Sequence, residues 1–154
     1  VANKVVLIVP KGKNPTKINS FEDVVTDKVR LIALGNSDVP VGQYSVEIFK
    51  NMGIWDKLTA ENKITYASNV KEVLAQTAEA AVSCGVVYST DAATSKAVQV
   101  VANAPAGSHK PIVYPAAILK DTKNKEAAEK FAKFLRSKPC TKVFTKIGFS
   151  VPEK

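Results

Sequence analysis

Two predicted helix starts and one tyrosine are the positions in this sequence best suited to binding chemistry. A helix is expected to follow Asp38-Val39-Pro40-Val41-Gly42, and another to begin at Asn69-Val70. The first turn of a helix carries free backbone N–H groups at the positive end of the helix dipole, so it can bind an anion without a basic side chain. Tyr88 ends the apolar run from Val82 and could add a hydroxyl donor. Ligands of open α/β sheets bind beyond the carboxyl ends of strands, so we expect one crevice for a small anion.

Each of these features alone also has a purely structural explanation. A helix that starts near a proline is usually only a helix start, and Tyr88 could equally be a half-buried strand residue. It is the combination of two helix starts with a strand end that indicates an anion site.

Side-chain catalysis and metal binding are not supported by the residue types present. The one histidine, His109, lies in a Pro/Gly/Ser loop beside Ser108 and Lys110, which is typical of a surface loop. Cys84 lies in an apolar run, and neither it nor Cys140 has a CxxC neighbour, so we expect no zinc site and no disulfide framework. Glycine-rich phosphate-binding motifs are also missing. We therefore expect a binding protein, not an enzyme, with no cofactor and no directly bound metal cation.

The composition is that of an ordinary globular domain and not of a nucleic-acid binder. Hydrophobic residues make up 45% and charged residues 23% of 154 residues, with a net charge of +8. Only Arg30 and Arg136 among the 22 basic residues are arginine, the usual reader of base edges. The lysines from Lys120 to Lys133 alternate with acidic residues as on a solvated helix face, from which they could steer an anion toward the protein.

Short apolar runs alternate with helical patterns in the first two thirds of the chain. Buried strands are predicted at residues 4–9, 30–35, 64–67, 82–89 and 98–102. Helices are predicted between them, one closed by Gly53 and one capped by Asn69 with Glu72. This alternation predicts an α/β lobe with a mostly parallel mixed sheet flanked by helices.

The last third of the sequence has a different pattern. An extended segment over 111–119 is followed by two amphipathic helices. Their apolar faces carry Phe131, Phe134, Leu135, Val143, Phe144 and Ile147.

Segments spread along nearly the whole chain resemble the substrate-binding protein of molybdate ABC transporters. In order they are Gly35-Asn-Ser-Asp-Val-Pro-Val-Gly-Gln-Tyr44, Gly53-Ile-Trp-Asp56, Val86-Val-Tyr-Ser-Thr-Asp-Ala92, Ser108-His-Lys-Pro-Ile-Val-Tyr-Pro115 and Ile147-Gly-Phe149. The resemblance implies a periplasmic-binding-protein fold of type 2, in which crossing strands join two α/β lobes. It also implies that a molybdate or tungstate oxyanion is held between the lobes by hydrogen bonds, with no counter-charge.

The resemblance assigns ligand contacts to three residues of this chain. Val41 and Val70 would donate their backbone N–H groups, and Tyr88 would donate its hydroxyl. Relatives usually have alanine at the position of Val41, and valine adds bulk there. All three residues agree with the anion site expected from the helix starts and the strand end.

The resemblance also implies how the chain is organised. Residues 1–9 would be the first hinge strand, 10–105 a complete lobe, 106–119 the return hinge strand and 120–154 a helical remnant of the other lobe. Family members begin with a further segment that supplies most of the first lobe, so we expect this chain to be a fragment.

The expected partners follow from the same resemblance. A receptor of this kind works outside the cytoplasm, in the periplasm or as a surface lipoprotein, and delivers its oxyanion to an ABC permease. Because the apolar faces of residues 120–154 lack their sheet, we expect them to pack on the lobe in a new position or, preferably, to form a homodimer.

Two other functions stay open on the sequence alone. The same fold could serve as the ligand-sensing module of a regulator, although no DNA-binding segment is present. It could also receive another small anion or an iron complex. Iron capture would favour clustered tyrosines, whereas Tyr44, Tyr66, Tyr88 and Tyr114 are dispersed in sequence.

Overall fold

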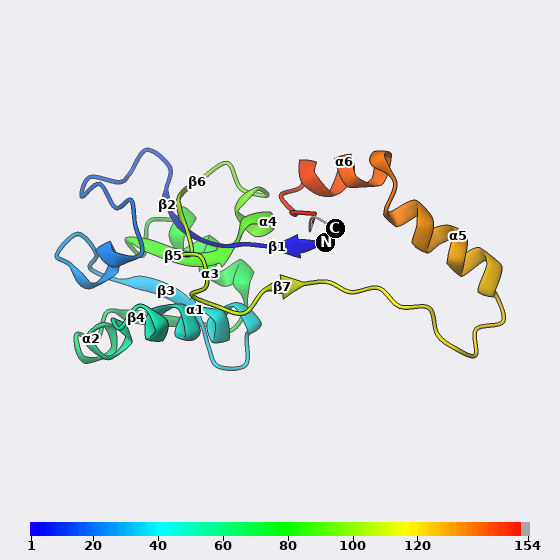
Figure 1. The fold of residues 1–154 in the computed structure, drawn as a ribbon. Coiled ribbons are helices and arrows are strands. Elements are labelled where there is room, and N and C mark those ends of the chain that lie inside the picture. The colour runs from blue at the N-terminus through cyan, green and yellow to red at the C-terminus, as the bar shows by residue number, and fades with distance from the viewer. Residues whose placement is uncertain (152–154) are drawn as a thin grey trace. The chain divides into compact units, whose positions relative to one another are not determined.

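The computed structural model describes residues 1–151 and consists of two compact units (Figure 1). We call residues Lys4–Lys110 the lobe. The tail unit comprises Val1–Asn3 together with the chain from Pro111 onward. The division therefore falls at residues 3/4 and 110/111, while the assignment of 1–9 and 106–119 as hinge strands stays a prediction. None of the helices in residues 1–151 is long and apolar enough to cross a membrane.

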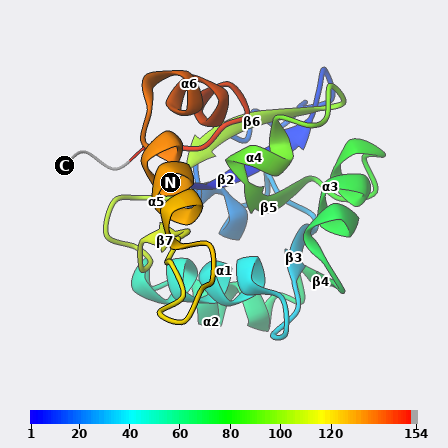
Figure 2. The ribbon, with the colours of Figure 1, turned by 90° about the vertical axis from the view of Figure 1, so that its right-hand side faces the viewer.

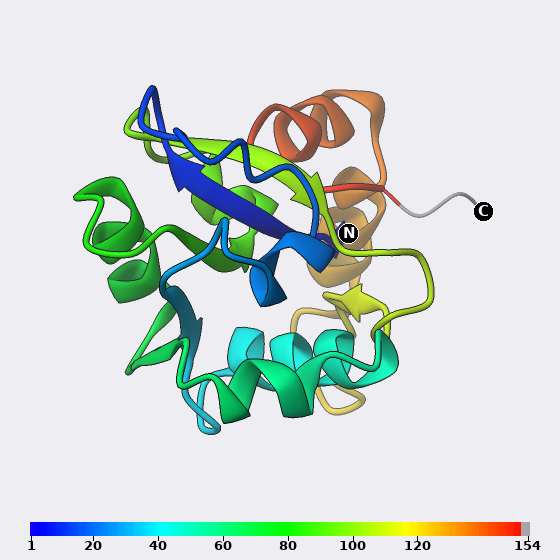
Figure 3. The same cartoon turned by 90° about the vertical axis from the view of Figure 1, so that its left-hand side faces the viewer.

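The lobe is built on a five-stranded mixed sheet of order β4-β3-β5-β2-β6. The paired strands β2 (dark blue) and β6 (yellow-green) lie side by side in Figure 3. Its strands are β2 (Val5–Pro10), β3 (Ile32–Gly35), β4 (Ile64–Ala67), β5 (Cys84–Tyr88) and β6 (Val98–Asn103). β3 runs parallel to β4 and to β5, whereas β2 runs antiparallel to β5 and to β6. The predicted α/β class and mixed sheet are confirmed, with parallel pairing confined to β4-β3-β5. β2 lies inside the sheet with a neighbour on each side, and all of its residues are buried.

The two main helices of the lobe cover opposite faces of the sheet (Figure 2). α1 (Pro40–Asn51) connects β3 to β4, and α3 (Val70–Ala78) connects β4 to β5 on the other side of β3. Right-handed crossovers that run in opposite directions along a sheet place their helices on opposite faces. Each helix starts just after a parallel strand ends, which is the arrangement that an α/β ligand site requires.

Three shorter helical segments complete the lobe. They are η1 (Glu22–Val25), α2 (Trp55–Ala60) and α4 (Ser89–Ala92). α2 was not predicted, since its single turn and a half offers only Leu58 as a buried residue. Gly53 between α1 and α2 has φ +71°, as expected for the predicted glycine at a helix C-terminus.

Close contact between α3 and β5 depends on a glycine. A Cβ added at Gly85 would collide with Thr77 Oγ1 and come within 3.0 Å of Val73 Cγ1. Thr77 is fully buried and donates its hydroxyl to the Val73 carbonyl at 2.9 Å, so its side chain cannot move aside without losing that bond. Next to it, Cys84 is 0% exposed, as predicted for a small buried hydrophobe, and burial raises the pKa of its thiol.

The tail unit holds the N-terminal residues and two helices. β1 (Ala2–Asn3) pairs antiparallel with β7 (Ile112–Val113), which is the only ladder formed by the predicted extended segment 111–119 within the described residues. α5 (Lys125–Leu135) and α6 (Lys138–Lys146) follow, as predicted. α5 has no buried residue, and Phe131 and Phe134 are 61% and 53% exposed.

Candidate functional site

The three predicted contact residues lie at one edge of the lobe's sheet. β3 and β4 pair with Gly35 opposite Ala67, and β3 and β5 pair in the same direction with Ala33 opposite Gly85. The carboxyl ends of these strands therefore share an edge. α1 and α3 both begin there, and Tyr88 is the last residue of β5. The expected gathering of the two helix starts and the strand end is thus what the topology produces.

The start of α1 is held tightly by the loop that precedes it. Asn36 donates its N–H to the Ala67 carbonyl at 2.9 Å, and its own Oδ1 accepts from the Asp38 N–H at 3.0 Å. Gln43 Nε2 donates to the Ser37 carbonyl at 2.8 Å. A Cβ at Gly42 would collide with the carbonyl oxygens of residues 35 and 36, so only glycine allows the helix to approach this loop so closely.

Val41 is the second residue of α1, after a proline at the first position. At this position an α-helix offers no carbonyl one turn earlier, so the Val41 N–H is available to a ligand in principle. Val41 is 0% exposed, however. Its side chain is therefore part of the lobe core rather than bulk in an open crevice. The Val41 N–H is therefore closed to solvent in this structure, unlike that of a half-exposed residue.

The start of α3 is organised by the predicted cap. Asn69 is in an extended conformation, and its Oδ1 accepts from the Glu72 N–H at 3.0 Å. Glu72 Oε2 in turn accepts from the N–H and the hydroxyl of Ser68, each at 2.8 Å. The hydrogen bond from the Ser68 N–H, followed by the one from its hydroxyl, lowers the pKa of Glu72. Val70, the first helical residue, is half-exposed and has no earlier carbonyl to receive its N–H, so this donor is open to a ligand.

Tyr88 is half-exposed and also forms the N-cap of α4. Asp91, in the first turn of α4, is beside it. Burial raises the pKa of Asp91, although hydrogen bonds from its own N–H and that of Tyr88, and the nearby charge of Lys71, act in the opposite direction. α3, which contains Lys71, packs against α4.

The structure adds two residues that the sequence did not predict for this region. The centroid of the Tyr44 ring lies 6.4 Å from that of Tyr88 and 5.5 Å from that of His109, and both contacts are edge to face. Tyr44 stands one helical turn after Val41, so its spacing could have indicated a shared face with the site. His109 comes from a distant loop, and no local pattern places it there. Clusters of His, Cys, Asp and Glu able to hold a metal do not occur in residues 1–151.

A cavity of about 360 Å³ lies at the other edge of the sheet, away from these residues. Its lining includes Pro10 at the end of β2, and Arg30 and Ser83 just before β3 and β5. Arg30 already donates to the Ala81 carbonyl at 3.1 Å, and Lys28 pairs with Asp23 at 2.7 Å. Arg30 and Lys28 thus already have internal partners, and the cavity lies away from the helix starts, so we do not assign the anion site to this cavity.

Known proteins share this fold and much of this sequence. A protein of Bacillus subtilis assigned as an ABC transporter substrate-binding lipoprotein is 42% identical over 152 residues, which are 97% of this chain and 56% of that protein. The molybdate-binding protein ModA of Haemophilus influenzae is 37% identical over 153 residues, 97% of this chain and 59% of that protein. The chain thus spans less than three-fifths of the length of these relatives.

The structural comparison agrees with the sequence comparison. The substrate-binding domain of an assigned molybdenum ABC transporter from Clostridium difficile matches with a TM-score of 0.90 and 36% identity, over 99% of this chain and 65% of that one. The model of a family described as bacterial extracellular solute-binding protein matches residues 1–150. These matches confirm the resemblance to substrate-binding proteins of ABC transporters, and the chain belongs to the family of bacterial extracellular solute-binding proteins.

Proposed function

We propose that this chain is the part of an ABC importer's receptor that captures molybdate, and tungstate in the same way. The observation that supports this most is the gathering of two helix starts and Tyr88 at one sheet edge. The proposed donors are the N–H groups of Val41 and Val70 and the Tyr88 hydroxyl. The molybdate-binding relative and the molybdenum-transporter neighbour support the choice of ligand. The receptor would work outside the cytoplasm and deliver the oxyanion to its permease, with no catalysis.

Neutral donors suit a ligand of this kind. A tetrahedral dianion accepts hydrogen bonds at every oxygen and needs no proton acceptor from the protein. Phosphate, which is partly protonated near neutral pH, would point an O–H at donors that cannot accept it. Molybdate and tungstate have the same charge and shape, so fixed donors would treat them alike.

A residue-resolved titration tests the proposed site. Amide signals of the ¹⁵N-labelled chain would be followed while molybdate, sulfate or phosphate is added. We expect molybdate to shift the amides of Val41, Val70 and Tyr88 in one saturable process, with phosphate weaker. Each charge-assisted hydrogen bond is worth ~1.5–3 kcal/mol, so a chain that offers few donors should bind in the high micromolar range or weaker. Shifts confined to other residues would contradict the site, and sub-micromolar affinity of a monomer would contradict the weak binding.

The contribution of Tyr88 can be measured against a matched control. Tyr88→Phe removes one hydroxyl donor and should weaken molybdate binding about ten- to hundredfold. Tyr66 is 54% exposed and lines a different cavity, with Thr59, Asn62 and Ile64. Tyr66→Phe should therefore leave the affinity unchanged. Equal affinities of the two variants would remove Tyr88 from the contact list.

We also propose that two copies pair through residues 120–154. The exposed apolar side chains of α5 and α6 support this, because burying each would contribute ~1.5–3 kcal/mol. Light scattering should give a dimer at micromolar concentration, and Phe131→Ser with Phe134→Ser should give a monomer. Lys130→Ser, at an exposed polar position of the same helix, is the control and should stay dimeric. A monomeric wild-type chain would contradict the pairing.

A further inference from the structure

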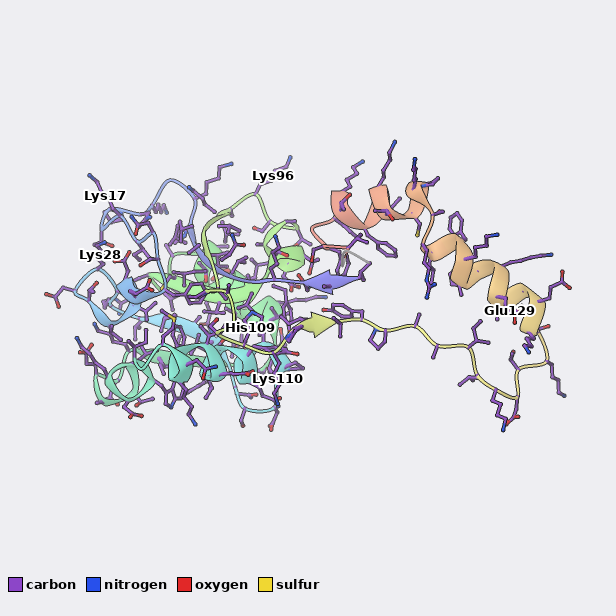
Figure 4. All side chains as sticks on the ribbon, viewed as in Figure 1. Lys17, Lys28, Lys96, His109, Lys110 and Glu129 are labelled. Carbon is purple, nitrogen blue, oxygen red and sulfur yellow. The ribbon has the colours of Figure 1, made fainter. Side chains whose placement is uncertain are left out.

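One face of α1 holds the loop that ends the lobe. Asn51 Nδ2 donates to the Ser108 carbonyl at 2.8 Å, and Glu47 Oε1 accepts from the Lys110 N–H at 3.2 Å. Tyr44 contacts the ring of His109 edge to face. Positions 44, 47 and 51 are separated by three and four residues, so they lie along one stripe of the helix. Loop residues 108–110 are thus attached to α1 at three points. Figure 4 labels two of these loop residues, His109 and Lys110.

The loop is also stiffened from within, which fixes the direction of its histidine. Ser108 is 6% exposed, and its hydroxyl donates to the Pro105 carbonyl at 2.7 Å. His109 Nδ1 lies 2.7 Å from the Lys110 carbonyl. The His109 ring therefore meets Tyr44 from a defined side. Tyr44 contacts His109 and Tyr88 with interplanar angles of 69° and 72°.

We propose that Tyr44 is a positioning residue that sets the direction of the Tyr88 hydroxyl, and that His109 holds Tyr44 in place. This inference rests on the proposed function, since it assigns a role toward the same anion. Tyr88 is half-exposed at the end of its strand, so the strand alone does not select one side-chain rotamer. Edge-to-face contact with Tyr44 restricts the ring before the ligand arrives. A donor that is already oriented loses less freedom on binding, which increases affinity.

Tyr44 and His109 would influence the bound anion through different numbers of intervening contacts. Tyr44 contacts the ring of Tyr88, and His109 contacts the ring of Tyr44. Replacing Tyr44 should therefore affect the anion more than replacing His109. Both effects should depend on the Tyr88 hydroxyl, because the ring contacts of Tyr44 and His109 serve to orient that group.

A double-mutant cycle tests this role. Tyr44→Leu removes the ring and should weaken molybdate binding about three- to tenfold in the NMR titration, whereas Tyr44→Phe keeps the ring and should bind like the wild type. In a Tyr88→Phe background, Tyr44→Leu should cause no further loss. His109→Ala should give a smaller loss than Tyr44→Leu. An equal loss from Tyr44→Leu with and without the Tyr88 hydroxyl would overturn the proposal, because it would show a merely structural role.

A measurement without ligand separates this inference from the proposed function. The χ1 angle of Tyr88 would be read from three-bond couplings in the free wild type and in Tyr44→Leu. We expect one rotamer in the wild type and Tyr44→Phe, and rotamer averaging in Tyr44→Leu, with the remaining amide signals unchanged. A single Tyr88 rotamer in Tyr44→Leu would overturn the positioning role. If molybdate shifts no signal of the wild type while the rotamer result holds, the proposed ligand is wrong and the positioning of Tyr88 stands.

Discussion

The lobe and the tail unit use similar hydrophobic residues with opposite results. In the lobe, Leu7 and its neighbours in β2 are 0–1% exposed between two paired strands and the covering helices. In the tail unit, Phe131 is larger than Leu7 but 61% exposed on α5. The helical pattern of α5 is as regular as that of α1. The difference shows that amphipathic periodicity predicts a helix but not the surface on which it packs.

The largest expected effect is a difference in the free energy of unfolding between variants truncated at Leu7 and at Phe131. Leu7→Ala creates a cavity in the closed core and should destabilise the lobe by ~2–5 kcal/mol. Phe131→Ala removes more atoms from an exposed face and should change stability by less than ~0.5 kcal/mol in the monomer. Urea unfolding followed by Trp55 fluorescence and by circular dichroism would report both. An equal loss in the two variants would show that the α5 face is covered in solution.

A smaller contrast concerns added atoms instead of lost ones. Gly42→Ala places a methyl group against the carbonyls of residues 35 and 36, and should destabilise the lobe by ~1–3 kcal/mol. Ala127→Leu enlarges an exposed side chain of α5 and should be close to neutral. Chemical denaturation midpoints of the two variants give the comparison. A neutral Gly42→Ala would mean that the loop before α1 yields easily and that its close approach to Gly42 is not required.

The smallest effect is a pH dependence located in the lobe. Burial alone would raise the pKa of Asp23, but hydrogen bonds from Lys28 and from the N–H groups of Asn19 and Ser20 hold it below its ordinary value of 3.8. A carboxyl with a lowered pKa stabilises the folded state above that ordinary value, and this contribution is lost as the pH falls through the folded pKa. Unfolding midpoints should therefore fall in acid less steeply in Asp23→Asn than in the wild type. Glu129→Gln, exposed on α5, should keep the wild-type slope, and an unchanged slope in Asp23→Asn would contradict this account.

Local patterns in the lobe were sufficient to predict most of its elements. The strand 64–67, the start of α3 at Asn69 and the glycine that closes α1 all depend on residues within one or two turns. The antiparallel placement of β2 between β5 and β6 could not be predicted in this way, because the residues of a strand do not determine which strand pairs with it. The structure supplied it through pairings such as Leu7 with Val86.

The candidate site shows the same limit. Its three donors were predictable because helix starts and strand ends have local signals and because the sheet topology unites them. The burial of Val41 was not, since it depends on how α1 packs in the tertiary fold. The ring contacts of Tyr44 with Tyr88 and with His109 could not be predicted either, because only the tertiary fold brings these residues together.

The claim that a helix N-terminus binds the anion is tested most directly by removing one backbone donor. Val70 is the first residue of α3, where proline is tolerated, and the extended Asn69 before it, with φ −162° and ψ 166°, suits a following proline. Val70→Pro thus deletes the N–H while leaving the helix in place, and Val70→Ala keeps the N–H as its control. Molybdate titration should show about ten- to hundredfold weaker binding to Val70→Pro than to Val70→Ala. Equal affinity of the two variants would contradict the account.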